Sequence, residues 1–135
     1  MILLDSTIII GIINKRPAPL RERFLEQVDR RETILVSTIV VFELRFGAAK
    51  SGKPAFNTQL LDEFLAGQVE VVAFEAADAA RAGSVRAELQ AKGTPIGPYD
   101  TLIAGQVLRL GATLVTANTR EFSRVAGLSV EDWTA

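Results

Sequence analysis

Asp5 is the first residue of this 135-residue chain that could do chemistry, because it interrupts the apolar run in "MILLDSTIII". Residues 2–5 have the composition of a short buried strand, where an unpaired carboxylate is costly unless it has a partner or a function. Ligands of open parallel sheets bind beyond the carboxyl ends of the strands. The sequence therefore predicts that Asp5 ends a strand and points toward a binding site.

Three further polar side chains are predicted to reach the same edge of the sheet. Glu43 lies on a predicted helix, within an apolar stripe that we expect to face the core. The residues of that stripe are Ile39, Phe42, Phe46 and Ala49. Asp100 falls in the first turn of a helix in "GPYDTLIAGQ", and Asn118 lies just past the end of the apolar strand "ATLVT".

Each of these residues also has a structural explanation. Glu43 could form a salt bridge. The candidate partners for that salt bridge are Arg45 and Arg81. Asp100 would be favoured in a first turn by the helix dipole. Asn118 could cap the next helix, with Glu121 three residues later as in a capping box.

The residue types present in the chain limit the reactions and metal sites that it can support. The chain has no histidine and no cysteine, which excludes thiolate or imidazole metal sites, cysteine nucleophiles and Ser-His-Asp triads. Carboxylates gathered at one point repel one another unless a cation neutralises them. Oxygen ligands suit Mg²⁺ or Mn²⁺, and such a cluster suits the metal-assisted hydrolysis of a phosphodiester.

The elements that must position these residues alternate between strands and helices. The predicted strands cover residues 2–5, 33–37, 69–74 and 112–116, with a short edge strand at 128–130. The predicted helices cover residues 7–13, 20–31, 38–50, 56–65, 75–92, 98–110 and 119–126. Apolar strands that alternate with helices indicate an α/β/α sandwich with a central, mostly parallel sheet. Because no linker interrupts the pattern, we expect a single domain over residues 1–135.

The amino-acid composition and the net charge exclude other classes of protein. Hydrophobic residues make up 48% of the chain, which is the globular norm. No apolar run reaches the roughly 18 residues that span a bilayer, and the N-terminus lacks the pattern of a signal peptide. We therefore expect a cytoplasmic protein with no membrane partner. A formal charge of -1 gives no overall attraction to nucleic acid.

The chain resembles the PIN-domain ribonucleases, and specifically the VapC toxins of bacterial type II toxin–antitoxin systems. The resemblance runs nearly end to end and is carried by "MILLDSTIII", "VSTIVVFELRFGAAKSG", "GTPIGPYDTLIAGQ" and "LVTANTREFSRVAGLSVEDW". It implies a compact α/β/α domain, usually a homodimer, with Mg²⁺- or Mn²⁺-dependent endoribonuclease activity. It also implies a VapB-type antitoxin that blocks the toxin, in a heterotetramer or larger assembly that contacts operator DNA through the antitoxin.

The resemblance also implies roles for individual residues. The family's catalytic acids correspond to Asp5, Glu43 and Asp100, which would bind the metal, and its fourth position falls on Asn118. The supporting residues would be Ser6, Thr7 and Glu121. Family members usually read Asp-Thr-Asn at the first motif, whereas Thr7 here lacks the amide. A weakened or catalytically silent PIN module that acts through antitoxin binding and operon autoregulation therefore stays open as an alternative.

Substrate and self-association are the remaining expectations. RNA, a tRNA or a ribosomal RNA, would approach past basic residues, each of which could equally be a solvated surface charge. These residues are Lys15, Arg16, Lys50, Lys53 and Arg120. A homodimer is predicted from the apolar helix positions Ile39, Val40, Phe42, Phe46, Leu60, Leu61 and Phe64. A phosphatase or receiver domain is the rival enzyme class, but "LLDSTI" lacks the second Asp of an Asp-x-Asp motif.

Overall fold

A five-stranded parallel sheet forms the centre of the molecule in the computed structural model, which describes residues 1–134. Its strands are β1 (Ile2–Leu4), β2 (Ile34–Ser37), β3 (Glu70–Val72), β4 (Thr113–Val115) and β5 (Ser129–Glu131). Their order is β3-β2-β1-β4-β5, and all four pairings are parallel. The predicted parallel sheet is confirmed.

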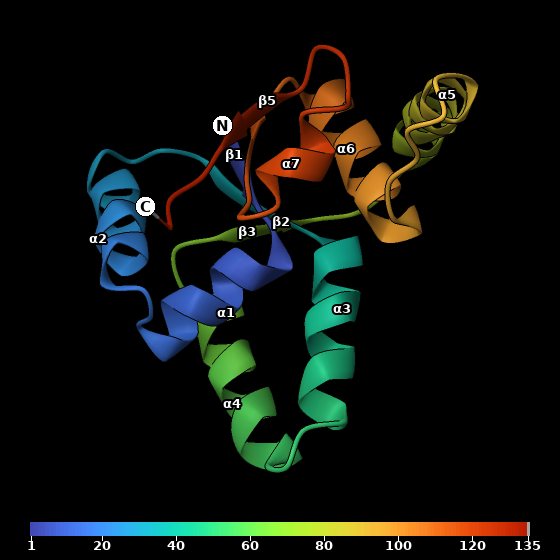
Figure 1. The fold of residues 1–135 in the computed structure, drawn as a ribbon. Coiled ribbons are helices and arrows are strands. Elements are labelled where there is room, and N and C mark those ends of the chain that lie inside the picture. The colour runs from blue at the N-terminus through green and yellow to red at the C-terminus, as the bar shows by residue number, and fades with distance from the viewer. Residues whose placement is uncertain (135) are drawn as a thin grey trace.

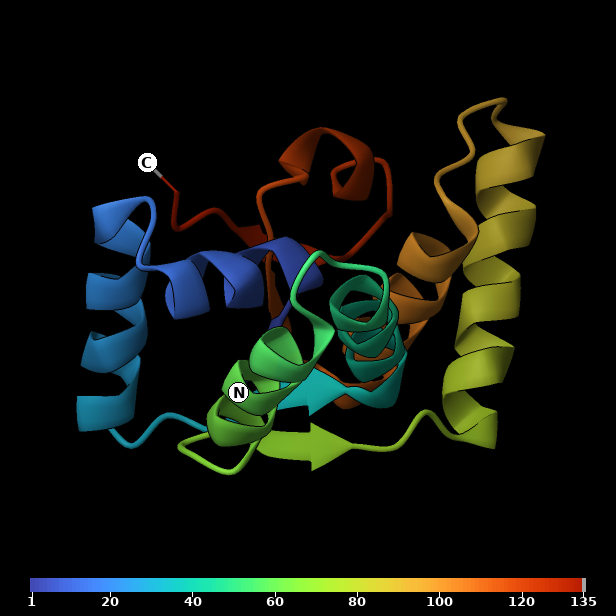
Figure 2. The same ribbon diagram turned by 90° about the horizontal axis from the view of Figure 1, so that it is seen from below.

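Helices cover both faces of this sheet. They are α1 (Ser6–Asn14), α2 (Ala18–Asp29), α3 (Thr38–Ala49), α4 (Pro54–Leu65), α5 (Ala76–Ala91), α6 (Pro98–Leu110) and α7 (Thr119–Phe122). In Figure 1, α1 and α4 lie below the sheet and α6 and α7 lie above it, while α5 packs outside α6. Figure 2 shows α1, α3 and α4 from below, gathered on the near side. The predicted α/β/α architecture is therefore confirmed, and none of the helices in residues 1–134 is long and apolar enough to cross a membrane.

The strand order reverses direction between β1 and β4. The chain moves from β1 outward to β2 and β3, then crosses back to β4 and continues to β5 on the other side. Right-handed crossovers place the helices of the two halves on opposite faces, which leaves a crevice where the halves separate. The ends of β1 and β4 therefore define where a ligand site belongs.

The faces of α3 differ from the prediction. The side chains that α3 buries are Val40, Leu44 and Ala48. Phe42 and Phe46 are 52% and 58% exposed, so the expected core stripe through them is wrong. The helix carries two apolar stripes, and the sheet and α4 cover only the one that begins at Val40.

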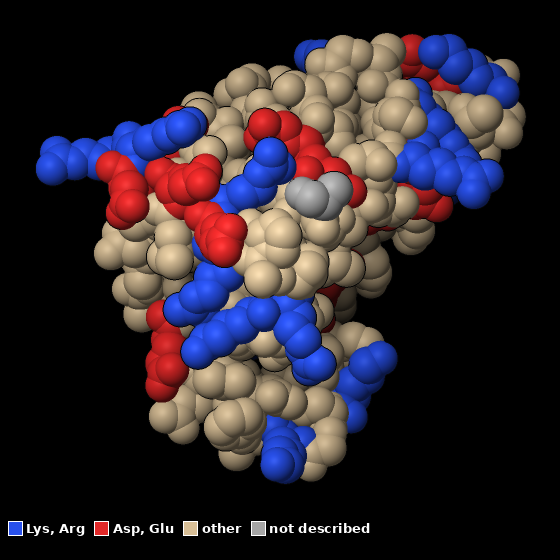
Figure 3. Space-filling view, turned by 60° about the vertical axis from the view of Figure 1, so that its left-hand side comes forward, with Lys and Arg blue, Asp and Glu red and all other residues tan. Residues whose placement is uncertain are grey.

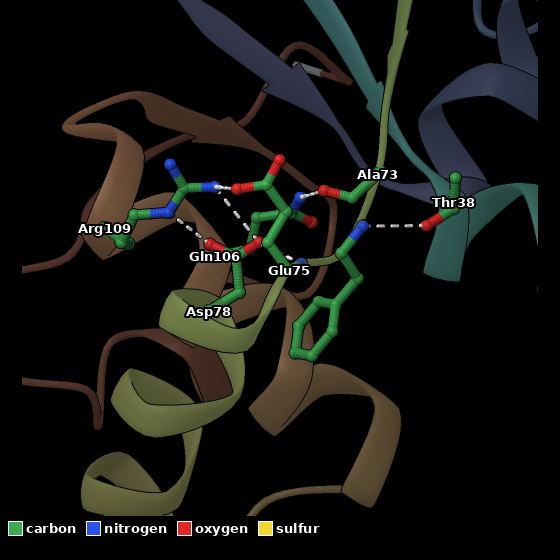
Figure 4. Close-up of polar contacts among 7 residues, drawn as sticks. Thr38, Ala73, Glu75, Asp78, Gln106 and Arg109 are labelled. Atoms are coloured by element: carbon green, nitrogen blue, oxygen red, sulfur yellow. Dashed lines mark hydrogen bonds and ion pairs between the residues drawn. The ribbon is translucent and has the colours of Figure 1, made fainter.

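A buried polar network fixes α6, the helix that carries Asp100, against α5 and the segment after β3 (Figure 4). Arg109 donates two hydrogen bonds to the buried Asp78, over 2.5 and 3.1 Å, and Gln106 donates one to the Ala73 carbonyl over 3.1 Å. Burial raises the pKa of Asp78, but the hydrogen bonds from Arg109, the hydrogen bond from the Glu75 backbone N–H and the positive charge of Arg109 together outweigh it and hold that pKa below its ordinary value. A Cβ at Gly105 would lie 2.5 Å from Ala82 Cα, so this close helix contact requires glycine.

Candidate active site

Asp5 lies at the end of β1, where it is the N-cap of α1 and 5% exposed. Its Oδ1 accepts a hydrogen bond from the Ser6 backbone N–H over 2.8 Å. Its Oδ2 accepts one from the Thr116 hydroxyl over 2.7 Å. The buried carboxylate is therefore held in one orientation at the carboxyl edge of the sheet, as predicted.

Thr116 is a site residue that the sequence reasoning missed. The register pairs Leu4 with Val115, so the next residue of each strand, Asp5 and Thr116, are neighbours. Thr116 is fully buried, and its hydroxyl donates to Asp5 while it accepts from the Asn118 N–H over 3.0 Å. The sequence contained a usable indication. Thr116 ends the apolar strand next to β1, and a hydroxyl at that position can hydrogen-bond to the acid at the end of the neighbouring strand.

Glu43 projects from α3 toward these residues and is partly buried. Burial, together with the negative charges of Asp5 and Asp100, raises the pKa of Glu43 to about 7. Its Oε1 is buried without a hydrogen-bond partner among residues 1–134. The predicted alternative of a salt bridge is wrong for the described residues, because Arg45 pairs with Asp62 over 2.6 Å instead and no ion pair involves Glu43.

Asp100 enters the site from the first turn of α6, which begins at Pro98. Burial raises its pKa to about 6, with further contributions from the charge of Asp5 and from the charge and hydrogen bond of Glu121. The Asp100 and Glu121 carboxyl groups are therefore neighbours between α6 and α7, where a cation would offset their negative charge.

Asn118 and Glu121 bring α7 into the site. Asn118 is the N-cap residue of α7, but its side chain makes no capping hydrogen bond, so the predicted capping box is wrong. The Asn118 amide instead donates to Glu121 Oε2 over 3.0 Å. Glu121 thus contacts both Asn118 and Asp100, which joins the fourth expected site position to the acids.

The donor set fits a hard divalent cation. Four carboxylates meet with no opposing Lys or Arg paired to them among the described residues, and Asp5 and Asp100 both raise the pKa of Glu43. The unpartnered Glu43 Oε1 is an oxygen that lacks a counter-charge. Within residues 1–134, no three of these acids are already placed to hold one ion. The acids interact strongly but would need side-chain movement to ligate together, and all-oxygen donors of this kind suit Mg²⁺ or Mn²⁺.

A groove of about 650 Å³ extends from the acids between α1, α3 and α4. Ser6 and Glu43 line its inner end, and the wall is largely apolar. Thr7 is exposed on the first turn of α1.

Of the basic residues predicted to contact RNA, Arg120 lies in α7 beside Glu121. The other four are further away: Lys15 and Arg16 follow the last residue of α1, and Lys50 and Lys53 flank the α3–α4 turn. At 1.5 Å per residue, the far end of α1 is about 13 Å from Asp5, and Lys50 at the end of α3 is about 10 Å along that helix from Glu43. These four residues therefore lie about two to three helical turns from the acids.

The surface from which a homodimer was predicted is partly covered within the chain. Val40 and Leu61 are buried, and the Phe64 ring packs against Phe24 with centroids 5.7 Å apart. Phe42 and Phe46 remain exposed. The apolar surface left for self-association is smaller than the sequence indicated.

The chain is similar over almost its whole length to a known family of proteins. The PIN domain family matches residues 2–128. The chain is 40% identical over 131 residues to "tRNA(fMet)-specific endonuclease VapC" of Shigella flexneri, a match that covers 97% of this chain and 96% of the relative. It is also 40% identical over 131 residues to "Ribonuclease VapC2" of Rickettsia felis, with the same coverage.

Solved structures show the same similarity. VapBC2 from Rickettsia felis, bound to a DNA fragment from its promoter, superposes with a TM-score of 0.91 at 38% identity and covers 98% of this chain and 99% of that chain. DNA-bound VapBC from Salmonella typhimurium has a TM-score of 0.89 at 39% identity, with 98% of this chain and 97% of that chain covered.

Proposed function

The chain belongs to the PIN-domain family, among the VapC ribonucleases, and we propose that it is the Mg²⁺- or Mn²⁺-dependent endoribonuclease toxin of a toxin–antitoxin pair. The observation that carries this proposal is that Asp5, Glu43 and Asp100 come together where the strand order reverses. Burial and the neighbouring negative charges raise the pKa values of Glu43 and Asp100, and a bound cation would offset this repulsion. Family membership sets aside the phosphatase and receiver-domain alternatives.

The residues have distinct tasks in this proposal. Asp5 and Asp100 would hold the ion directly, and Glu43 would bind it directly or through water. The ion, when bound, lowers the pKa of a water molecule and offsets charge on the phosphoryl oxygens. Thr116 and the Ser6 N–H hold both oxygens of Asp5 in place. Glu121 and Asn118 position Asp100 from α7, with Ser6 and Thr7 at the start of α1 as supporting groups.

The substrate is proposed from the relatives. Two relatives at 40% identity carry the name tRNA(fMet)-specific endonuclease, so initiator tRNA is the first RNA to test, ahead of other tRNAs and ribosomal RNA. Arg120, beside Glu121, would contact a phosphate that enters the site. Lys15, Arg16, Lys50 and Lys53 would contact phosphates further from the cut.

The partners are also proposed from the relatives. A VapB-type antitoxin would neutralise the toxin, and operator DNA would be contacted through that antitoxin, because the similar solved complexes are VapBC assemblies with DNA. A homodimer, and with antitoxin a heterotetramer or larger assembly, is also proposed, and the exposed Phe42 and Phe46 side chains on α3 support self-association. Light scattering of the purified chain at tens of micromolar, a rough working range for moderate interfaces, tests the homodimer, and a monomer would contradict it.

The experiment that tests the proposed activity is cleavage of total cellular RNA by the purified chain with Mg²⁺ or Mn²⁺, followed by mapping of the new ends. We expect a small number of cut sites, lost in chelator. The alternative of a catalytically silent module predicts intact RNA together with normal antitoxin binding.

A further inference from the structure

One peptide unit just after β3, the one between Ala73 and Phe74, is hydrogen-bonded to two helices at once. Its carbonyl oxygen accepts a hydrogen bond from the Gln106 side chain on α6 over 3.1 Å. Its N–H donates one to the Thr38 hydroxyl at the start of α3 over 3.1 Å. Figure 4 shows both bonds, with Gln106 and Thr38 on opposite sides of this segment. The peptide unit therefore lies between α3 and α6 and contacts both.

These two helices carry two of the acids. Glu43 is five residues after Thr38, about 8 Å along α3, and Asp100 is six residues before Gln106, about 9 Å along α6. The peptide unit between the helices is trans, so it is planar and its C=O and N–H point in opposite directions. Because a planar unit bends little, the two hydrogen bonds fix how far Thr38 lies from Gln106.

The chain on either side of this peptide unit is also held in place. Before it, β3 is paired with β2 as far as Val72 and Ser37. After it, the Glu75 N–H donates to Asp78 Oδ2 over 2.7 Å, and Arg109 of α6 donates two hydrogen bonds to the same carboxylate. Asp78 is fully buried, whereas Figure 3 shows Lys and Arg interspersed with Asp and Glu on the outer surface of the molecule. The segment is therefore anchored on both sides of the peptide unit.

Gln106 makes this contact at a cost. Its side chain is fully buried, and its Oε1 has no hydrogen-bond partner within the described part of the chain. A buried polar atom without a partner is unfavourable, and a leucine would fill similar space without that penalty. The benefit of the amide therefore lies in the hydrogen bond that it donates to Ala73.

We propose that the Ala73–Phe74 peptide is a rigid spacer that sets the distance between Glu43 and Asp100, and that Thr38 and Gln106 are positioning residues for the metal site. This proposal rests on the proposed metal-dependent cleavage and adds two residues that contact neither the ion nor the RNA. A displacement of about 1 Å caused by a change far from the chemistry can cost about 100-fold in activity. Helix spacing should therefore decide whether both carboxylates reach one ion.

The alternative is that these hydrogen bonds only stabilise the fold. A contact that only stabilises would lower the thermal midpoint when it is removed, but it would leave the ion affinity of the folded protein unchanged. Ion affinity and helix spacing, both measured well below the thermal midpoint, therefore separate the two explanations.

The test uses Gln106→Leu and Thr38→Val in the full chain, because each removes one of the two hydrogen bonds with little change in volume. Thr38→Ser keeps the hydroxyl and is the conservative variant. Phe24→Leu is the control for lost stability, because Phe24 is buried on α2 against Phe64 of α4 and does not contact the spacer. Mn²⁺ alone is the probe, and its affinity is measured by calorimetry.

Helix spacing is measured as the distance between two spin labels. Because the chain has no cysteine, labels attach only at introduced positions. Ala49→Cys on α3 and Leu102→Cys on α6 provide these positions, since Ala49 is exposed and Leu102 is partly exposed. The labelled pair is combined with each variant in turn.

We expect Gln106→Leu and Thr38→Val each to weaken Mn²⁺ binding by about 10-fold, the lower end of the range for groups that orient metal ligands, and to broaden the distribution of label distances. The double variant should be little worse than either single one, because either change already releases the spacer. Thr38→Ser and Phe24→Leu should bind Mn²⁺ like the wild type. The KM for RNA should stay unchanged, and the loss of cleavage should narrow as Mn²⁺ saturates.

Several results would overturn the proposal. Unchanged Mn²⁺ affinity in Gln106→Leu, with a lower thermal midpoint, would show that the hydrogen bonds only stabilise the fold. Equal weakening by Phe24→Leu would assign the effect to lost stability, and unchanged label distances would show that the peptide does not set the spacing. A wild type that binds no Mn²⁺ would also overturn it. A wild type that binds Mn²⁺ but cleaves no RNA would contradict the proposed activity alone, and the Mn²⁺ affinities would still decide on the spacer.

Discussion

The Thr116 hydroxyl donates a 2.7 Å hydrogen bond to Asp5 Oδ2 and so joins β4 to β1 where the strand order reverses. The same hydroxyl accepts from the Asn118 N–H, which ties the α7 side of the site to the buried acid. Asp5 is therefore oriented by a residue 111 positions away in sequence. The positions of the acids depend on the register of the sheet.

Thr116→Val should lower RNA cleavage by about 10- to 100-fold, because losing one group that orients a metal ligand typically costs that much. The change keeps the side-chain shape but leaves Asp5 Oδ2 and the Asn118 N–H without this partner, so we expect the free energy of unfolding to fall by about 1–3 kcal/mol. Cleavage rates and denaturant melts measure the two effects. Thr116→Ser, which keeps the hydroxyl, is the control and should retain most activity; equal loss in both variants would show that packing, not the hydrogen bond, matters.

Stability without metal should fall as pH rises from about 4.5 to about 7. Glu43 has an ordinary pKa of 4.5 and a folded pKa of about 7, and Asp100 goes from 3.8 to about 6. In this window the folded state binds more protons than the unfolded state, so the contribution of both groups is fully present below pH 4 and is lost as pH passes through the folded values. Thermal midpoints in chelator across this range measure the slope.

Glu43→Gln should flatten this pH dependence, because an amide does not titrate. Asp29→Asn, at an exposed position on α2, is the charge-matched control and should leave the slope unchanged. A saturating divalent ion should also reduce the slope by favouring the charged acids. A midpoint that rises with pH across this window would contradict the assigned repulsion among the acids.

Thr7→Asn should raise cleavage at limiting Mg²⁺, with the difference narrowing as the metal saturates. Thr7 is exposed at the first turn of α1, two residues after Asp5, and an amide there can both donate and accept hydrogen bonds. Because one such contact to a metal-bound water is worth about 10- to 100-fold in affinity, the gain should lie within that range. A metal titration of both forms decides it, and equal activity throughout would mean that Thr7 is a neutral variant.

The sequence predicted the parts of the site that follow from local patterns. Asp5 could be placed because a carboxylate after an apolar strand must lie at the edge of the sheet, and the start of α6 at Pro98 fixed Asp100 in a first turn. The sequence correctly predicted that Glu43 lies near the other acids. The prediction that its side of α3, with Phe42 and Phe46, faces the core was wrong. Its own helix carries two apolar faces, and only the packing of α4 and the sheet decides which one is covered.

The features that the sequence did not predict depend on contacts between distant segments. The bond between Asp5 and Thr116 depends on the β1–β4 register, which alternation of apolar residues does not specify. The Asn118–Glu121 hydrogen bond replaced a capping box with the same residue types and spacing. Asp100 and Glu121 lie close together only where α6 and α7 meet, so the raised pKa of Asp100 depends on that tertiary contact.

The most direct test of the central claim is cleavage of purified initiator tRNA by the wild type and by Asp100→Asn, each with Mg²⁺, with Mn²⁺ and in chelator. We predict cleavage by the wild type with either metal, none in chelator, and a loss of at least about 100-fold in Asp100→Asn, at or beyond the upper range for losing a group that only orients a ligand. The thermal midpoint of Asp100→Asn in chelator should equal or exceed that of the wild type, because one repelling charge is gone. Cleavage that persists in chelator, or that survives in Asp100→Asn with an intact fold, would contradict the claim that this acid cluster is a metal-dependent nuclease centre.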